Sequence, residues 1–368
     1  MFVTANRVLR DQVRKSFQGM KHGFSGQHQH AATKYPATLN QVSEEMFPLF
    51  LTQGEFLKMV DGTTKEPFWA RNLDGTLKHK VSSAFHEERG MLDAIPDNDD
   101  FEWSDSDDDE QWIPHQGASS NAAAAEKTRS EPGRGLEVDF IVFVDVIWPK
   151  IKKARLDLKL LSPASIFQEI HSYIKGSGDA LRSEGGFLTR DEYNTLGAKM
   201  APNFKQALVN DEAGDKSASR LVVYDVFLQY EKEKTALNGY DVSDVVFHIY
   251  RQLEQQEPQQ IPRVHSTFVD ETQDFTQAEL ALFLRLTHDK NDCFFSGDTC
   301  QTIACGVGFR FEDLKSLFKY EQDRQARENK GVSLPAALRV RVPNVKTLAV
   351  NYRYSKKKEK RKKRHNKH

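Results

Sequence analysis

Hydrophobic residues return at helical spacing through most of the middle of the chain. Ile166, Ile170 and Ile174 form one such stripe within the run 137–255, and a period of three to four residues places its members on one helix face. The run EVDFIVFVDVIWPKI at 137–151 fits the same period, although its β-branched residues leave a strand open as an alternative. We therefore predict that 137–255 is mostly helical.

A different pattern stands closer to the end of the chain. The short strand-type runs VHSTFV at 264–269 and CFFSGD at 293–298 flank a helical run at 276–288. That helix begins with Thr276 and Glu279, which have the spacing of a capping box. A strand, a helix and a strand within about thirty residues predict a βαβ unit and therefore a parallel sheet.

The beginning of the chain predicts a strand, MFVTAN, followed by an amphipathic helix. Val8 and Phe17 would lie on its hydrophobic face, and Arg10 on its basic face. The run 44–60, broken at Pro48, predicts buried helical material.

Two segments have a composition that does not suit a folded core. Residues 93–135 are acidic and then small and polar, which predicts a disordered insertion. Trp103 and Trp112 within it are either anchors for a basic partner or members of a solvated loop. The tail 354–368 is rich in Lys and Arg; it is a nuclear-import signal, a contact for phosphates, or an unstructured terminus.

The overall composition indicates whether the protein is secreted, bound to a membrane or intracellular. The 368 residues are 38% hydrophobic and 29% charged, with a net charge of −1 that hides the opposite extremes of the two biased segments. Three cysteines are too few for a disulfide framework. No signal peptide or membrane-spanning run is apparent. We expect an intracellular protein of the nucleus or cytoplasm, neither secreted nor bound to a membrane.

Candidate chemistry stands where the predicted strands end. FVDETQDFT at 268–276 runs from hydrophobic residues directly into Asp270 and Glu271, and Gln301 follows the next strand. In open parallel sheets, ligands bind outside the carboxyl ends of the strands. One carboxylate together with substrate phosphates suffices to hold Mg²⁺, and an adjacent acid can activate water.

Several motifs together resemble one protein family. FVDETQDFT, FFSGDTCQTI and LAVNYR resemble, in order, motifs II, III and IV of the UvrD/Rep-like superfamily 1 helicases. The opening FVTANRVLRDQV resembles motif Ia, and NGYDVSDVVFHI the segment before motif II. Apart from the acidic insertion, the resemblance covers about residues 1–353.

The resemblance implies a role for each matching residue. Asp270 would hold Mg²⁺ and Glu271 would activate water. Gln301 and Arg353 would reach the γ-phosphate of ATP. Tyr352 would stack on the adenine of ATP. Thr4 and Asn6 would contact the backbone of single-stranded nucleic acid (DNA or RNA).

The chain departs from the family at one motif. The phosphate-binding loop G-x-x-x-x-G-K-[ST] does not occur in the sequence, and in the family that loop precedes motif Ia. We therefore expect that this chain is a piece of a larger protein, which supplies the missing motor segments. Alone, the chain would be inactive as an ATPase.

These observations predict an α/β fold. Its core would be a parallel-sheet, P-loop NTPase-like (RecA-like) unit without the Walker A strand and loop, joined to a mostly helical insertion. The predicted divisions are a partial 1A-like motor domain (1–25 and 235–353), a 1B-like helical insertion (40–92 and 136–234), the disordered segment (93–135) and the basic tail (354–368). The expected function is that of an ATP-dependent helicase domain, and the alternative is a non-catalytic module that binds nucleic acid or protein.

Overall fold

The computed structural model describes most of the chain outside the two biased segments. The described residues are 1–25, 35–79, 135–154, 161–196, 204, 219–257, 259–298, 308, 310–329 and 334–348. The chain divides into two compact units, 1–317 and 318–368.

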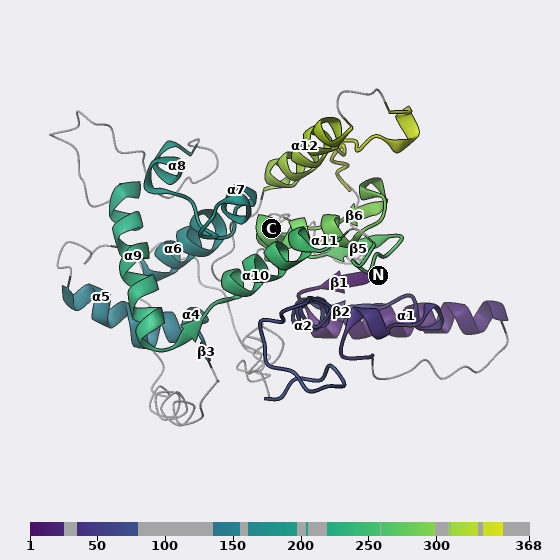
Figure 1. The fold of residues 1–368 in the computed structure, drawn as a ribbon, viewed down its shortest axis with the longest axis horizontal. Coiled ribbons are helices and arrows are strands. Elements are labelled where there is room, and N and C mark those ends of the chain that lie inside the picture. The colour runs from purple at the N-terminus through teal and green to yellow at the C-terminus, as the bar shows by residue number, and fades with distance from the viewer. Residues whose placement is uncertain are drawn as a thin grey trace, which may run out of the picture. The chain divides into compact units, whose positions relative to one another are not determined.

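A four-stranded parallel sheet forms the centre of the first unit (Figure 1). Its strands, in spatial order, are β2 (Phe50–Thr52), β1 (Phe2–Thr4), β5 (Thr267–Asp270) and β6 (Cys293–Phe295). Helix α11 (Gln277–Leu286) connects β5 to β6, which are parallel neighbours. This confirms the predicted βαβ unit, together with its capping box at Thr276 and Glu279.

The two faces of the sheet differ in how well they are covered. Val3, Leu51 and Val269 point to one face and are at most 1% exposed. The opposite face carries a row of aromatic side chains in register across the four strands. The row consists of Phe50, Phe2, Phe268 and Phe294. Phe17 of α1 (Arg7–Ser25) reaches the Phe50 end of this row, at 5.5 Å between ring centroids.

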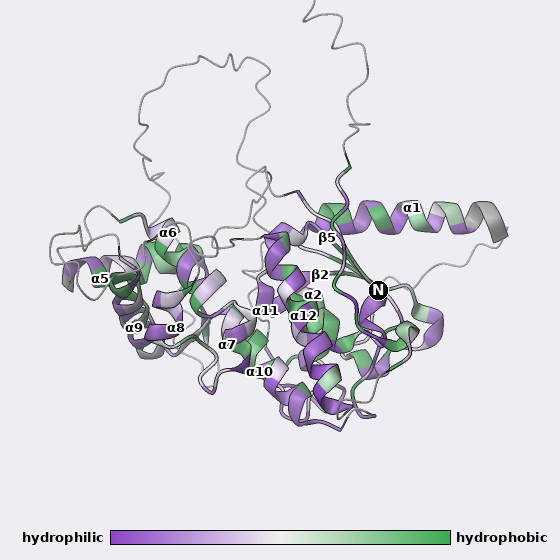
Figure 2. Ribbon diagram, turned by 90° about the horizontal axis from the view of Figure 1, so that it is seen from above, coloured by the Kyte–Doolittle hydropathy of each residue, from purple (hydrophilic) through white to green (hydrophobic). Residues whose placement is uncertain are grey.

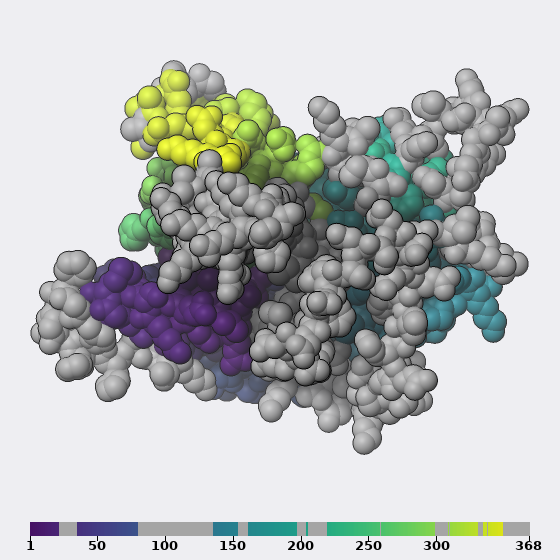
Figure 3. Space-filling model, turned by 180° about the vertical axis from the view of Figure 1, so that it is seen from behind, coloured from purple at the N-terminus to yellow at the C-terminus, as the bar shows by residue number. Residues whose placement is uncertain are grey.

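Helix α1 does not bury the face that its hydrophobic residues predict. Val8 is 65% exposed and Phe17 is 36% exposed, whereas Arg10 is only 7% exposed. Arg10 lies against α2 (Gln53–Asp61), and its Nη1 donates to both carboxylate oxygens of Glu55, at 2.8 and 2.6 Å. The prediction for this helix was therefore wrong for Val8 and Arg10, whereas Phe17 does pack against the sheet. Figure 2 shows hydrophobic and hydrophilic residues interspersed along α1, and Figure 3 shows the helix lying at the surface.

The run 44–60 is not a broken helix as predicted. It contains a 3₁₀ turn at Glu44–Met46, strand β2 and helix α2. Strand β2 pairs with β1, so these residues extend the sheet, although the sequence placed them in the helical insertion. The physical reason is tertiary, because β2 is only three residues long and forms a strand by pairing with β1, which is distant in sequence.

The segment 137–255 is mostly helical in its described parts, as predicted. The helices are α4 (Phe140–Val142), α5 (Trp148–Ala154), α6 (Pro163–Gln168), α7 (Gly178–Arg182), α8 (Arg190–Thr195), α9 (Arg220–Ala236) and α10 (Val242–Gln255). Two π-helical stretches, Phe143–Ile147 and Glu169–Ile174, continue α4 and α6. Ile166, Ile170 and Ile174 are fully buried in their common core. Strand β3 (Leu136–Glu137), where this segment begins, pairs in parallel with β4 (Gly239–Tyr240), which lies between α9 and α10.

Helix α12 (Phe311–Glu328) begins in the first unit and ends in the second. Within the second unit, Gln325 of α12 bonds both to the carbonyl of Leu338 and to the backbone N–H of Val340. The whole basic tail 354–368 and all of the predicted disordered insertion 93–135 except its last residue lie outside the described residues, so those interpretations stay predictions, as does the division into domains. No helix among the described residues is long and apolar enough to cross a membrane.

Candidate functional site at the carboxyl ends of β1, β5 and β6

Asp270 ends β5 at the edge of the sheet where the strands' carboxyl ends meet. It stands directly opposite Thr4, the last residue of β1. Its side chain is half-buried, and Ser296 Oγ, just beyond β6, donates to its Oδ1 at 2.6 Å. One carboxylate oxygen is thereby oriented by the neighbouring strand.

Glu271 has a left-handed backbone, with φ 54° and ψ 44°. For a non-glycine residue this conformation costs about 1 kcal/mol or more, so the surroundings must hold it. They do so through Thr272, whose backbone N–H and hydroxyl both donate to the carbonyl of Ser296, at 2.9 and 2.7 Å. The chain then continues into the 3₁₀ turn Thr272–Asp274, which lies between Glu271 and α11.

Thr4 and Asn6 are both engaged locally. Thr4 is fully buried, and its Oγ1 accepts the backbone N–H of Asn6 at 3.3 Å. Asn6 is exposed, and its Oδ1 accepts the backbone N–H of Leu9 at 3.1 Å, which caps the start of α1. The contact of Thr4 and Asn6 with nucleic acid stays a prediction, and in this conformation Asn6 is the accessible partner of the two.

The donor atoms at the β5 edge suit a hard cation. Asp270 offers a carboxylate oxygen other than the one that Ser296 holds, and Glu271 and Thr4 stand beside it. Mg²⁺ prefers oxygen ligands and retains most of its water, so one such carboxylate with substrate phosphates forms an adequate site.

A second group of acids in the described residues does not suit a cation. Carboxylate oxygens of Glu231, Asp241 and Asp244 lie within 4.8 Å of one another. The ammonium groups of Lys175 and Lys234 already lie among them, each within 3.0 Å of all three carboxylates. This cluster is therefore a buried ion-pair network.

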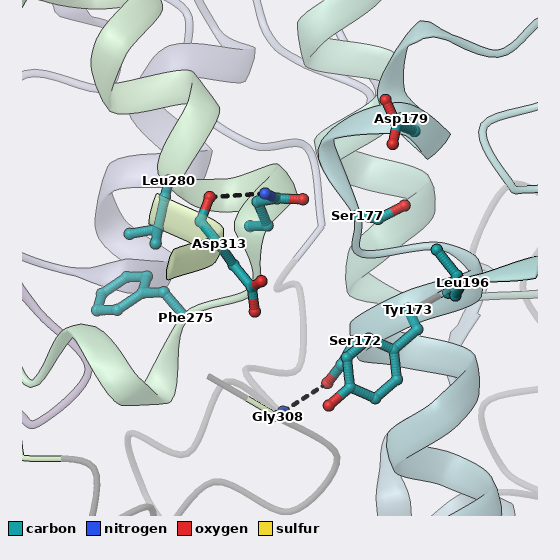
Figure 4. Close-up of a pocket in the computed structure, with 10 residues that line it drawn as sticks. Ser172, Tyr173, Ser177, Asp179, Leu196, Phe275, Leu280, Gly308 and Asp313 are labelled. Carbon is teal, nitrogen blue, oxygen red and sulfur yellow. Dashed lines mark hydrogen bonds between the residues drawn. The ribbon is translucent and has the colours of Figure 1, made fainter. Parts of the chain in front are cut away.

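A pocket lies away from these acids, between the helical segment and α11 and α12 (Figure 4). Its lining includes Ser172, Tyr173, Phe275 and Asp313. Burial raises the pKa of Asp313 to about 6. Neither Asp270 nor Glu271 lines this pocket, so it is not part of the site at the strand ends.

The structure brings together only part of the predicted site. Asp270, Glu271 and Thr4 share one edge of the sheet, whereas Gln301, Tyr352 and Arg353 lie outside the described residues. Their roles stay predictions.

Sequence reasoning gave no role to Ser296 or Gln273, although both make hydrogen bonds at this edge. The sequence did place Ser296 at the end of the neighbouring predicted strand, and this position could have indicated its role. Gln273 was visible between the acids of the quoted motif.

Comparison with known proteins supplies the family. The family described as UvrD/REP helicase N-terminal domain matches residues 76–325. The human protein TPR and ankyrin repeat-containing protein 1 is 34% identical over 322 residues, which cover 87% of this chain and 10% of that protein. The chain thus corresponds to a small portion of this much longer relative. By the family match, and in agreement with its parallel α/β sheet, the chain belongs to the UvrD/REP helicase N-terminal domain family.

Proposed function

We propose that the chain contributes the acidic edge of an ATP site to a UvrD-like motor that moves along single-stranded nucleic acid. The observation that carries this proposal is the placement of Asp270 at the carboxyl end of β5, opposite Thr4 and held by Ser296. This is the edge of a parallel sheet at which ligands bind. Family membership supports the same reaction class.

Each acid has a distinct part in the proposed reaction. Asp270 would hold Mg²⁺, which when bound neutralises charge on the β- and γ-phosphates. Glu271, which directly follows Asp270 and has a left-handed backbone, would orient and deprotonate the attacking water. Ser296 keeps the Asp270 carboxylate in place by donating to one of its oxygens.

The remaining parts of the proposal concern residues beyond the described site. Gln301 and Arg353 would contact the γ-phosphate, Arg353 as a fixed cation for the developing charge. Tyr352 would stack on adenine. Thr4 and Asn6 would lie along the nucleic acid, as motif Ia does in the family.

Nucleotide binding tests the proposal directly. We expect a fluorescent ATP analogue to bind the chain only with Mg²⁺, and Asp270→Asn to weaken that binding about ten- to a hundredfold, since a charged contact is lost. Asp292→Asn is the matched control, because Asp292 is exposed at the opposite, amino end of β6. Equal binding by wild type and Asp270→Asn would show that Asp270 holds no metal.

Steady ATP hydrolysis is not expected from these 368 residues alone. They contain no G-x-x-x-x-G-K-[ST] loop, whose charge-assisted bonds to the triphosphate are each worth about 1.5–3 kcal/mol. ATPase activity that disappears in Glu271→Gln would contradict this expectation.

The second candidate is a non-catalytic module that binds nucleic acid or protein. The absence of that loop from the sequence is the observation that favours it. Retention of single-stranded DNA or RNA without any Mg²⁺-dependent nucleotide binding would support this module over the motor.

A further inference from the structure

Gln273 connects the two strand ends at the candidate site. It follows Glu271 by two residues and is only 1% exposed. Its Nε2 donates to Glu271 Oε2 at 2.6 Å, and its Oε1 accepts the backbone N–H of Asp298 at 3.0 Å. One side-chain amide therefore bonds at once to the acid after β5 and to the backbone after β6.

The orientation of this amide is determined by its partners. A carboxylate can only accept from the amide nitrogen, and a backbone N–H can only donate to the amide oxygen. A 180° flip of the Gln273 amide would set donor against donor at Asp298 and acceptor against acceptor at Glu271. The two partners together therefore fix the orientation of the amide, and a flip would break both hydrogen bonds.

Gly297 makes room for the link. A Cβ at this position would lie 2.5 Å from Gln273 Oε1 and 3.1 Å from the backbone nitrogen of Thr272. Any larger residue would push the amide away from the Asp298 N–H. The Gly-Asp pair after β6 is therefore fitted to the side chain of Gln273.

We propose that Gln273 is a positioning residue that couples the Glu271 carboxylate to the segment following β6. When the carboxylate exchanges its bond with Gln273 for a bond to water, the amide is released, and its hold on the Asp298 backbone weakens. The backbone of Asp298, just beyond the end of β6, would therefore respond to the state of the Glu271 carboxylate. The catalytic meaning of this coupling rests on the proposed function, but the coupling itself does not need a nucleotide.

Residue-resolved hydrogen–deuterium exchange of the full, nucleotide-free chain tests the coupling. Gln273→Leu should speed exchange of the Asp298 amide about two- to tenfold, because one hydrogen bond is lost. Glu271→Ala should act in the same direction, although it leaves both Gln273 and Asp298 unchanged. Glu271→Gln should leave the exchange rate near that of wild type, because its side-chain carbonyl still accepts from Gln273.

The double variant separates coupling from simple packing. With Gln273→Leu already present, Glu271→Ala should cause no further increase at Asp298. The proposal would be overturned if the two substitutions together speeded exchange of the Asp298 amide by the product of their separate effects. It would also be overturned if Glu271→Ala left that exchange rate unchanged. If Gln273→Leu does not fold, the difference in Asp298 exchange rate between Glu271→Ala and Glu271→Gln is sufficient to test the coupling.

A matched control and a nucleotide arm complete the experiment. Gln229 also donates to a glutamate, Glu233, at 3.2 Å, and Gln229→Leu should not change exchange at Asp298. Failure of a Mg²⁺-bound ATP analogue to bind would count against the proposed function, whereas the nucleotide-free comparison would still decide whether Gln273 couples the two strand ends.

Discussion

Asp241 is the residue whose replacement we expect to cost most stability. It is fully buried at the start of α10, where its Oδ1 accepts the backbone N–H of Asp244 at 3.0 Å. Its Oδ2 accepts from Lys175 Nζ at 2.5 Å, Lys234 Nζ at 3.0 Å and Tyr230 Oη at 2.9 Å. These partners join α9 and the end of the π-helical stretch Glu169–Ile174 to α10.

Asp241→Asn isolates the charge of this residue. The asparagine can still cap α10 through its side-chain oxygen, but it places an NH₂ group against two ammonium groups and a hydroxyl. Removing one partner of a buried ion pair typically costs about 3–5 kcal/mol. Glu231 and Asp244 remain near the lysines but are each 29% exposed, so we expect a loss of about 4 kcal/mol in the free energy of unfolding.

Chemical denaturation followed by circular dichroism measures this loss. Asp139→Asn is the matched control, since Asp139 also caps a helix, by accepting the backbone N–H of Val142 at 2.8 Å, and no lysine of the described residues pairs with it. We expect the control to cost no more than about 1 kcal/mol. If Asp241→Asn were as mild as Asp139→Asn, the reasoning about buried charge would be refuted.

The pH dependence gives a second check on the same residue. Burial alone would raise the pKa of Asp241, but Lys175 and Lys234 outweigh it and hold the pKa well below its usual value. A depressed pKa means that the stabilisation is present above the ordinary Asp value of about 3.9 and is lost as the pH falls through the lower, folded-state value. The difference between wild type and Asp241→Asn should therefore be constant near neutral pH and shrink below about pH 4.

Four further predictions concern other described residues. Because burial raises the pKa of Asp313 to about 6, its contribution to stability should increase as the pH falls from about 6 to 4, and Asp313→Asn should remove that part of the stability–pH profile. Gly186→Ala should destabilise by about 1–3 kcal/mol in denaturant titrations, since φ is +74° and the new Cβ would lie 2.7 Å from the Phe247 ring. Gly19→Ala, with open space around it in α1, should instead stabilise by about 0.5–1 kcal/mol. Burial raises the pKa of the Cys293 thiol to about 11, so iodoacetamide should label it about a hundredfold more slowly at neutral pH than an exposed cysteine, as read by mass spectrometry.

Local signals predicted the elements that depend on neighbouring residues. The predicted capping box at Thr276 is present, because a cap bonds only to the following turn. The βαβ unit was predictable for a related reason. Two strand-type runs joined by one helix leave few arrangements other than parallel neighbours, and their acids then fall at a common edge.

Interactions between residues far apart in the sequence could not be predicted from the local pattern of hydrophobic and polar residues. The burial of Arg10 depends on Glu55, 45 positions away, and no periodicity within α1 announces that partner. Strand β2 was missed because three residues carry too little pattern to outweigh the helix that follows. The joint role of Gln273 also needed the fold, since its second partner, Asp298, lies on a different strand end.

The sequence by itself determined the family motifs, the helical middle of the chain and the presence of acids at the end of a strand. Each of these depends on residue types and spacing within a few turns of chain. Only the tertiary structure decided that Thr4 and Asp270 face each other, that Ser296 holds Asp270 and that two lysines neutralise Asp241. Those contacts form when segments far apart in sequence are packed together, and burial then makes the hydrogen bonds and charges strong enough to select partners.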